Sequence, residues 1–124
     1  MRAADSRFRL AKGLRELADH ASEVELRNSL SRSYYSIYHA AKVLLDKIDH
    51  HNIAEELSKL NPQAGMEIEV ETLQILRARA DYDPTFVERE FGGNLEAFRI
   101  EVQKRLEQSR EIFRWISAEL EREH

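Results

Sequence analysis

The segment Leu30-Ser31-Arg32-Ser33-Tyr34-Tyr35-Ser36-Ile37-Tyr38-His39-Ala40-Ala41 places two different stripes of side chains on opposite sides of one predicted helix. Because a helix turns by about 100° and rises by about 1.5 Å per residue, Arg32 and His39 lie roughly 20° apart around the axis and about 10 Å apart along it. Tyr35 and Asn28 share this polar stripe. The opposite stripe is apolar and consists of Leu26, Leu30, Ile37, Ala41, Leu44 and Ile48. The pattern predicts that Arg32 and His39 face away from the local core.

The composition predicts one all-α domain covering residues 1–124. The chain is 42% hydrophobic and 34% charged and contains only four Gly and two Pro, which favours helices over strands and is enough for one core. Because no cysteine is present, disulfides, thiolate metal ligands and thiol nucleophiles are excluded. No apolar segment follows the first charges, and no run of about 18 apolar residues occurs, so we expect a cytoplasmic protein with neither a signal peptide nor a membrane span.

The overall charge does not favour nonspecific binding to nucleic acid. The formal net charge is −4, although residues 1–50 carry nine Lys and Arg against seven Asp and Glu, while the remainder carries ten against sixteen. The half that contains Arg32 is therefore mildly basic, but this bias identifies no ligand by itself.

Two main helices and one short helix are predicted in the first half of the chain. The first covers about residues 7–21, where Leu and Ala repeat at helical spacing. Ser22-Glu23-Val24-Glu25 has the pattern of a capping box, which predicts that a second helix begins there and continues to about Ile48. The same pattern at Asn52-Ile53-Ala54-Glu55 predicts a short helix that Asn61-Pro62 ends.

Two further helices are predicted in the second half. One covers about residues 65–80, and the last begins after Gly92-Gly93-Asn94, a turn followed by a cap. Residues 83–94 read as a connection. The predicted core stripe of the last helix is Leu95, Phe98, Val102, Leu106, Phe113, Ile116 and Leu120. The predicted fold is an antiparallel up-and-down helical bundle of four main helices and one short helix.

Arg32 and His39 have the chemistry that cleavage of a phosphodiester needs. A guanidinium pairs with phosphate oxygens, and an imidazole moves a proton near neutral pH. RNA supplies its own nucleophile, so no metal is required, and cleavage would leave a cyclic phosphate and a 5′-hydroxyl. One copy holds a single histidine on this stripe, so a separate general acid and base would come from a two-fold dimer. From the residues alone, an ordinary solvated surface or a dimer contact is favoured over catalysis.

The remaining candidates have simpler structural explanations. In Leu76-Arg77-Ala78-Arg79-Ala80-Asp81-Tyr82, Arg77 and Asp81 lie four residues apart and can pair at a helix end, with Tyr82 covering the core. The alternative is a second basic rim of a phosphate cleft. His50-His51 is an unconvincing metal site because no third ligand has suitable spacing. We therefore predict no metal site and no cofactor.

Two of these segments resemble the small prokaryotic HEPN-domain proteins. In that family the first motif reads approximately Ser-Arg-x-Tyr-Tyr-x-x-Phe-His-Ala-Ala, matched here by residues 31–41 with Tyr38 in place of Phe. The second reads approximately Arg-x-x-Ala-Asp-Tyr and is matched by residues 77–82, with a His-led segment between the two at His51. The resemblance covers most of the chain.

The resemblance implies a HEPN-like helical bundle that dimerises, with Arg and His motifs meeting in a cleft between the two copies. Many family members are metal-independent endoribonucleases, including toxins neutralised by a minimal nucleotidyltransferase encoded beside them. The ribonuclease motif would be Arg32 and His39, separated here by six residues, the widest spacing that the family pattern allows. No tyrosine lies two places after His39, where some of these toxins carry the residue that the antitoxin modifies.

The leading hypothesis is a toxin-type endoribonuclease with an Arg/His cleft at a homodimer interface. Arg32 would stabilise charge on the phosphate, His39 would be the general base or acid, and Tyr35 and Asn28 would position the substrate. Arg77, Asp81 and Tyr82 would support the neighbouring structure. The alternative is a non-catalytic HEPN module that binds a nucleotide or a partner protein, such as a nucleotidyltransferase; a purely structural oligomer is less favoured.

Overall fold

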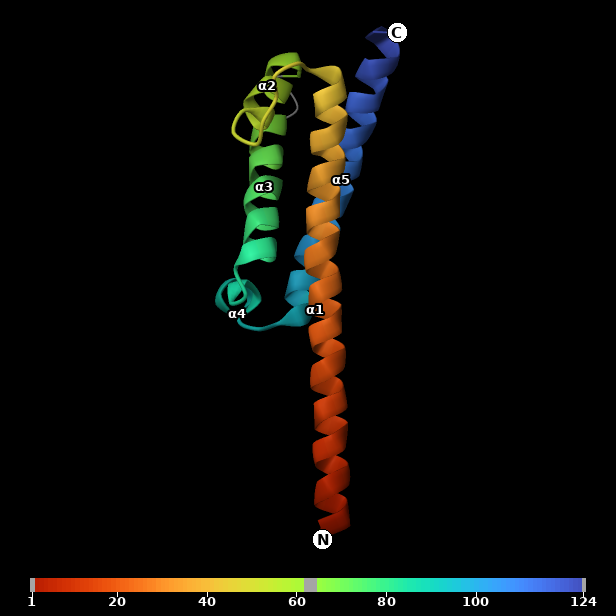
Figure 1. The fold of residues 1–124 in the computed structure, drawn as a ribbon, viewed down its shortest axis with the longest axis vertical. Helices are drawn as coiled ribbons and strands as arrows, with labels where there is room; N and C mark the ends of the chain where they lie inside the picture. Colours follow the sequence, from red (N-terminus) through yellow and green to blue (C-terminus); the bar gives the residue numbers. More distant parts are fainter. Residues whose placement is uncertain (1, 62–64, 124) are drawn as a thin grey trace.

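The computed structural model describes residues 2–61 and 65–123, and all of its regular structure is helical (Figure 1). Side chains are described for residues 19–61 and 65–122. The all-α class predicted from the composition is confirmed. The helices of the described residues are α1 (Arg2–Leu44), α2 (Ile53–Leu60), α3 (Met66–Tyr82), α4 (Phe86–Phe91) and α5 (Leu95–Glu123).

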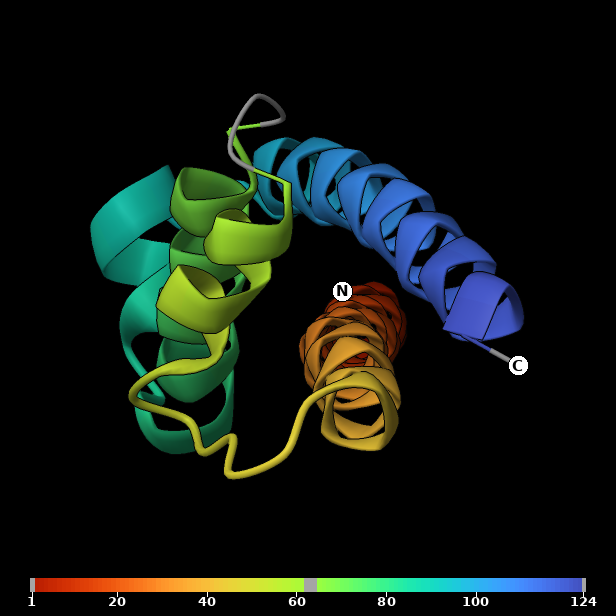
Figure 2. The same cartoon turned by 90° about the horizontal axis from the view of Figure 1, so that it is seen from above.

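Three long helices surround the core. Helix α1 packs against both α5 and α3, and α3 runs in the opposite direction to the other two (Figure 1). Seen from above, α5 crosses obliquely over one side of α1, while α3 and the short helices lie on its other side (Figure 2). The polar stripe of α1 therefore lies between two flanks, one facing α3 and one facing α5.

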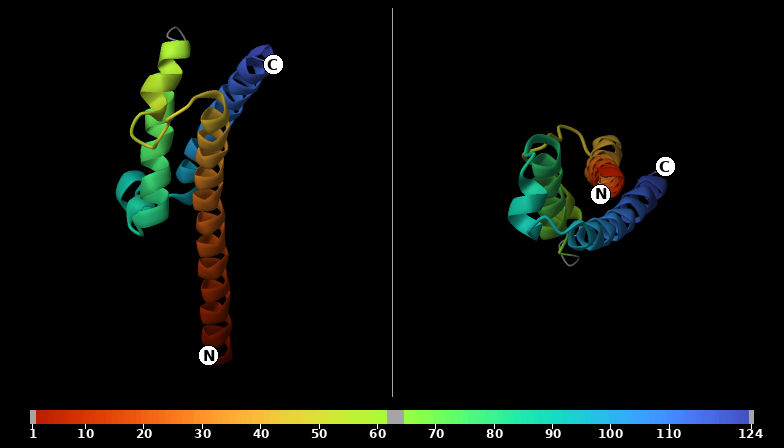
Figure 3. Two further views of the ribbon diagram at one scale, coloured as in Figure 1. Left: turned by 45° about the horizontal axis from the view of Figure 1, so that its top comes forward. Right: turned by 90° about the horizontal axis from the view of Figure 1, so that it is seen from below.

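The predicted break at Ser22 is wrong, because α1 continues through it from Arg2 to Leu44. Neither Gly nor Pro occurs between Gly13 and Leu44, so the backbone hydrogen bonds of the helix continue through Ser22. A side-chain cap at Ser22 is therefore not needed. The expected four main helices and one short helix are instead three long helices and two short ones. The first part of α1 extends beyond the other helices instead of folding back along them (Figure 3).

Helix α1 ends at Leu44 rather than near Ile48, and a tight turn follows it. Lys47 has a left-handed backbone with a φ of 61°. Asp49 then accepts hydrogen bonds from the backbone N–H groups of His51 and Asn52, at 2.8 and 3.0 Å. Asn52 accepts from the N–H of Asp49 at 2.8 Å and makes no side-chain cap for α2. Helix α2 begins where the sequence predicts, but the predicted capping box does not form.

The connection predicted over residues 83–94 contains helix α4, which was not predicted from the sequence. Its six residues are too few to show a helical repeat. The turn and cap predicted after it are confirmed. Gly92 and Gly93 have φ angles of 59° and 71°, which favour glycine. Asn94 accepts a hydrogen bond from the N–H of Ala97 at 3.1 Å, so it caps the start of α5.

The core confirms most of the predicted apolar stripes. On α1, Leu30, Ile37, Ala41 and Leu44 are buried. On α5, Phe98, Val102 and Ile116 are buried as predicted, but Ile112 takes the place expected for Phe113, which is 44% exposed. In the part of the chain that the structure describes, no helix is long and apolar enough to cross a membrane.

Candidate functional site

The predicted polar stripe lies on the outward side of α1. Arg32, His39 and Asn28 are exposed, and Tyr35 is partly buried. The arginine side chain donates to the hydroxyl of Ser29 at 3.4 Å, whereas the imidazole of His39 lies against Tyr35 with ring centroids 6.1 Å apart. Within the described residues, the side chains of Arg32 and His39 make no contact with each other. The two groups share a face but have different neighbours.

On the α3 flank of α1, two tyrosines and a histidine form a compact cluster. Tyr34 is fully buried, and its hydroxyl lies 2.7 Å from Nδ1 of His50. The His50 ring also stacks on Tyr38 with centroids 4.1 Å apart. Burial raises the pKa of Tyr34 to about 12. The pKa of His50 is lowered by burial and by the nearby positive charges of Arg77 and Lys42.

These pKa shifts favour the neutral form of both groups. A neutral phenol and a neutral imidazole form one hydrogen bond here, and the tautomer of His50 decides which of the two donates. The side chain of Gln74 also donates to the carbonyl oxygen of His50. From the sequence, metal binding was the only role considered for His50, because its contact with Tyr34 depends on the turn after α1. Through this contact His50 packs the turn against the core.

Arg77 joins α3 to the same cluster. Its side chain is buried, and its guanidinium carbon lies 4.9 Å from the ring centroid of Tyr34 and 5.3 Å from that of Tyr35. It pairs with Asp81 at 3.5 Å, which confirms the pair predicted from their spacing, and Asp81 accepts from Ser31 of α1 at 3.3 Å. Within the described residues, Nε of Arg77 is buried without a hydrogen-bond partner. The prediction that Tyr82 covers the core is wrong, because its side chain is 77% exposed.

Arg27 makes a second connection to α3 that the sequence did not reveal. Its guanidinium donates to the carbonyl oxygens of Ala80 and Asp83, each at 2.9 Å, and to that of Pro84 at 3.4 Å. Carbonyl groups at the end of a helix lack partners within the helix and carry partial negative charge. Arg27 therefore caps the C-terminal end of α3 from the side of α1.

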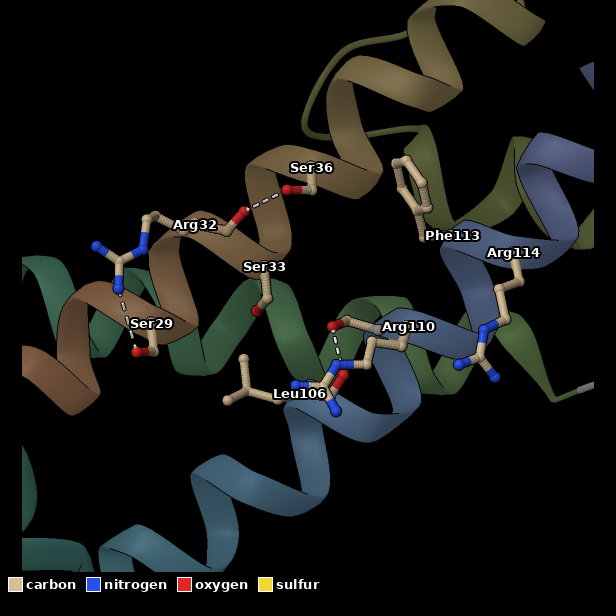
Figure 4. A pocket seen from close by; sticks show the side chains of 9 residues that line it. Ser29, Arg32, Ser33, Ser36, Leu106, Arg110, Phe113 and Arg114 are labelled. Carbon is tan, nitrogen blue, oxygen red and sulfur yellow. Dashed lines mark hydrogen bonds between the residues drawn. The ribbon is translucent and has the colours of Figure 1, made fainter.

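On the α5 flank of α1 there is an open groove of about 430 Å³ (Figure 4). Its walls combine serine hydroxyls, arginines and two apolar side chains. The lining residues are Ser29, Arg32, Ser33, Ser36, Leu106, Ser109, Arg110, Phe113 and Arg114. Arg32 is the only member of the predicted polar stripe among them. The sequence analysis did not predict that residues of α5 belong to a site. The feature that could have indicated it is the spacing of Arg110 and Arg114, which lie four residues apart.

The side chains described by the structure form no group of three or more His, Cys, Asp or Glu residues with the geometry of a metal site. His51 is exposed, and His50 uses Nδ1 for its contact with Tyr34. The two histidines thus have separate environments.

Comparisons with known proteins give no assignment. No protein-family model matches the chain, and no curated protein and no solved structure is significantly similar to it. The function is therefore inferred from the residues themselves and from their arrangement.

Proposed function

We propose that this protein is a HEPN-like, metal-independent endoribonuclease that acts as a homodimer in the cytoplasm. The observation that carries the proposal is the position of Arg32 and His39. Both are exposed on the outward side of α1, opposite its buried stripe, and the arginine also lines a groove that contains two more arginines. The resemblance of residues 31–41 and 77–82 to the HEPN motifs supports the same conclusion.

The proposed reaction uses the 2′-hydroxyl of the RNA as nucleophile. His39 accepts the 2′-hydroxyl proton while the oxygen attacks the adjacent phosphorus, and Arg32 stabilises the negative charge that grows on the phosphate oxygens. The bond from phosphorus to the 5′-oxygen breaks, and this oxygen takes a proton from His39 of a second copy. The products are a 2′,3′-cyclic phosphate and a 5′-hydroxyl. Tyr35, which packs against the His39 ring, orients the imidazole, and Asn28 contacts the substrate on the same stripe.

A non-catalytic binding module is the second candidate, and a specific observation favours it. Arg32 leans toward Ser29, while His39 lies against Tyr35 and Tyr38. The two groups therefore need not act on one atom. In this alternative the same stripe binds a nucleotide or a partner protein such as a nucleotidyltransferase, without breaking a bond.

A cleavage assay in the presence of a chelator tests the proposal. Wild type, Arg32→Ala and His39→Ala are purified and incubated with single-stranded RNA and EDTA, and circular dichroism checks their folding. We expect cleavage by the wild type and a loss of at least about a hundredfold in each variant. His20→Ala is the matched control, because His20 is also exposed on α1 but lies about 28 Å from His39 along the helix axis.

Two outcomes would reject the proposal, one its mechanism and the other the enzymatic activity. Undiminished cleavage by His39→Ala would remove its acid–base role, and an inactive wild type whose binding or dimerisation changes in both variants would establish the module instead. Light scattering on the same samples measures the dimer. A monomeric wild type that still cleaves RNA would contradict the supply of a second His39 by another copy.

A further inference from the structure

The arginines whose side chains the structure describes divide into two groups by their charge partners. Outside the α1–α5 groove, every arginine whose side chain is described lies within 4.0 Å of a carboxylate. These are Arg27, Arg77, Arg79, Arg89, Arg99, Arg105 and Arg122. The described residues provide no such partner for Arg32, Arg110 or Arg114, and all three line the groove. In a chain with a formal charge of −4, this separation marks the groove as the place for an anion from outside.

The three guanidinium groups are spread along the groove. Figure 4 shows Arg32 near one end, Arg110 between the two helices and Arg114 near the other end, and not gathered around one point. Arg110 and Arg114 are separated by one turn of α5, a rise of about 6 Å. A single phosphate could engage only one of these positions well. An extended ligand with repeated negative charges fits the arrangement better.

An exposed aromatic ring adjoins the charges. Phe113 is 44% exposed and lies next to Arg114 in the chain, with its ring at the groove (Figure 4). An aromatic ring beside a basic groove is the combination on which single-stranded nucleic acids stack their bases, independently of sequence. In a duplex the bases are stacked on each other, so an aromatic ring at the wall of a groove cannot reach one without opening the strand.

The serine hydroxyls of the groove are already used as donors. Ser29, Ser33, Ser36 and Ser109 each donate to a backbone carbonyl of their own helix, at 2.8 to 3.0 Å. The oxygens of Ser33 and Ser36 therefore remain as acceptors, for example for amino groups of a base, whereas Ser29 already accepts from Arg32 and Ser109 is buried. The arginines are left as the donors for phosphate oxygens.

We infer that the α1–α5 groove binds single-stranded RNA, with Arg110 and Arg114 on successive phosphates and Phe113 stacked on a base. The inference rests on the proposed function in that it names where the substrate of that reaction is held, with Arg32 common to the groove and the cleavage site. It adds three residues of α5 that the sequence motifs do not contain.

The test measures binding without cleavage. A fluorescent oligouridylate with 2′-O-methyl groups cannot supply the nucleophile, so its anisotropy reports affinity alone. We expect at least a tenfold weaker Kd for Arg110→Gln/Arg114→Gln and at least a fivefold weaker Kd for Phe113→Ala. Lys104→Gln is the matched control, because it removes one positive charge from an exposed position of α5 outside the groove, and we expect less than a twofold effect.

Salt dependence provides a second measurement. For a single strand, the slope of log Kd against log salt decreases by about 0.7 for each phosphate that the protein no longer binds. The arginine double variant should therefore show a slope smaller by about 1.4, and Phe113→Ala should leave the slope unchanged. Equal changes in Kd and in salt dependence for Lys104→Gln and the double variant would show that the strand binds through nonspecific charge attraction, which would overturn the inference.

Competition distinguishes other occupants of the groove. Duplex RNA that binds as tightly as the single strand, complete displacement of the strand by AMP at similar affinity, or tighter binding of polyglutamate would each overturn the inference in favour of another ligand. Failure of the proposed function is separable from these outcomes. If the wild type binds the strand through α5 but cleaves no RNA, the binding groove is supported and the enzymatic activity is rejected. If cleavage and binding are unchanged in Arg110→Gln/Arg114→Gln, the enzymatic activity is supported and the binding groove is rejected.

Discussion

The two flanks of α1 use arginine in opposite ways. On the α3 flank, Arg77 is buried, lies over two tyrosine rings and pairs with Asp81. On the α5 flank, Arg110 and Arg114 are exposed, and no described carboxylate forms an ion pair with either of them within 4.0 Å. A charge that is enclosed and paired holds helices together, while a charge left open in a groove is available to a ligand. The α3 flank thus provides the framework, and the α5 flank provides the candidate binding surface.

The largest expected effect comes from the α3 flank. Arg77→Ala removes a buried side chain from two tyrosine rings and leaves Asp81 without its ion-pair partner, so we expect the free energy of unfolding to fall by about 3 kcal/mol. Urea unfolding followed by circular dichroism measures it. Arg110→Ala should change the same quantity by less than about 0.5 kcal/mol. Similar losses in both variants would abolish the distinction between the flanks.

Arg27→Ala should have the next largest effect. It removes the charged donor to the carbonyl groups of Ala80, Asp83 and Pro84 at the end of α3, and we expect a loss of about 2 kcal/mol. Hydrogen exchange should show faster opening of the last turn of α3. Exchange that accelerates equally along α5 would contradict a local role for Arg27.

A smaller effect should appear as a pH dependence of stability. The pKa of His50 is lowered from 6.5 in the folded protein, so the unfolded chain binds a proton at a higher pH than the folded one. Stability should therefore fall as the pH decreases through about 6.5, and the loss should be complete below the lowered pKa. Thermal unfolding between about pH 7.5 and 5 should show a steeper decline for wild type than for His50→Gln. Parallel curves would exclude His50 as the cause.

The smallest effect is expected on the α5 flank, and its sign is opposite. Arg110 and Arg114 are like charges four residues apart on one helix, so Arg114→Gln should stabilise the free protein by about 0.3 kcal/mol at low ionic strength. The gain should disappear at high salt because exposed charges are screened. A measured destabilisation above about 1 kcal/mol would show that Arg114 has a structural role.

Local patterns in the sequence predicted the contacts that lie within one helix. The apolar stripe of α1 and the Arg77–Asp81 pair follow from a spacing of three or four residues and are confirmed. The cap at Ser22 was also a local signal, but it failed because an uninterrupted helix satisfies the same backbone groups. Local preference was in that case weaker than continuation of the helix.

Contacts between elements distant in the chain were not predictable in this way. The Tyr34–His50 hydrogen bond requires the left-handed turn at Lys47, and the groove requires the oblique placement of α5 beside α1 (Figure 2). On α5 the periodic pattern placed Phe113 in the core, whereas packing buries Ile112 and leaves Phe113 at the groove. Arg32 and His39 could thus be predicted from the sequence, but the α5 side of the candidate site could not.

The unbroken course of α1 has a geometric consequence for any assembly. A helix of 43 residues spans about 64 Å, and each residue along it adds a set rise and a set rotation. A molecule that binds the projecting first part of α1 therefore lies at a fixed distance from Arg32 and His39 and at a fixed angle around the helix axis. Inserting a single residue near Leu14 would turn such a molecule by about 100° around the axis and leave the α1–α5 packing in register.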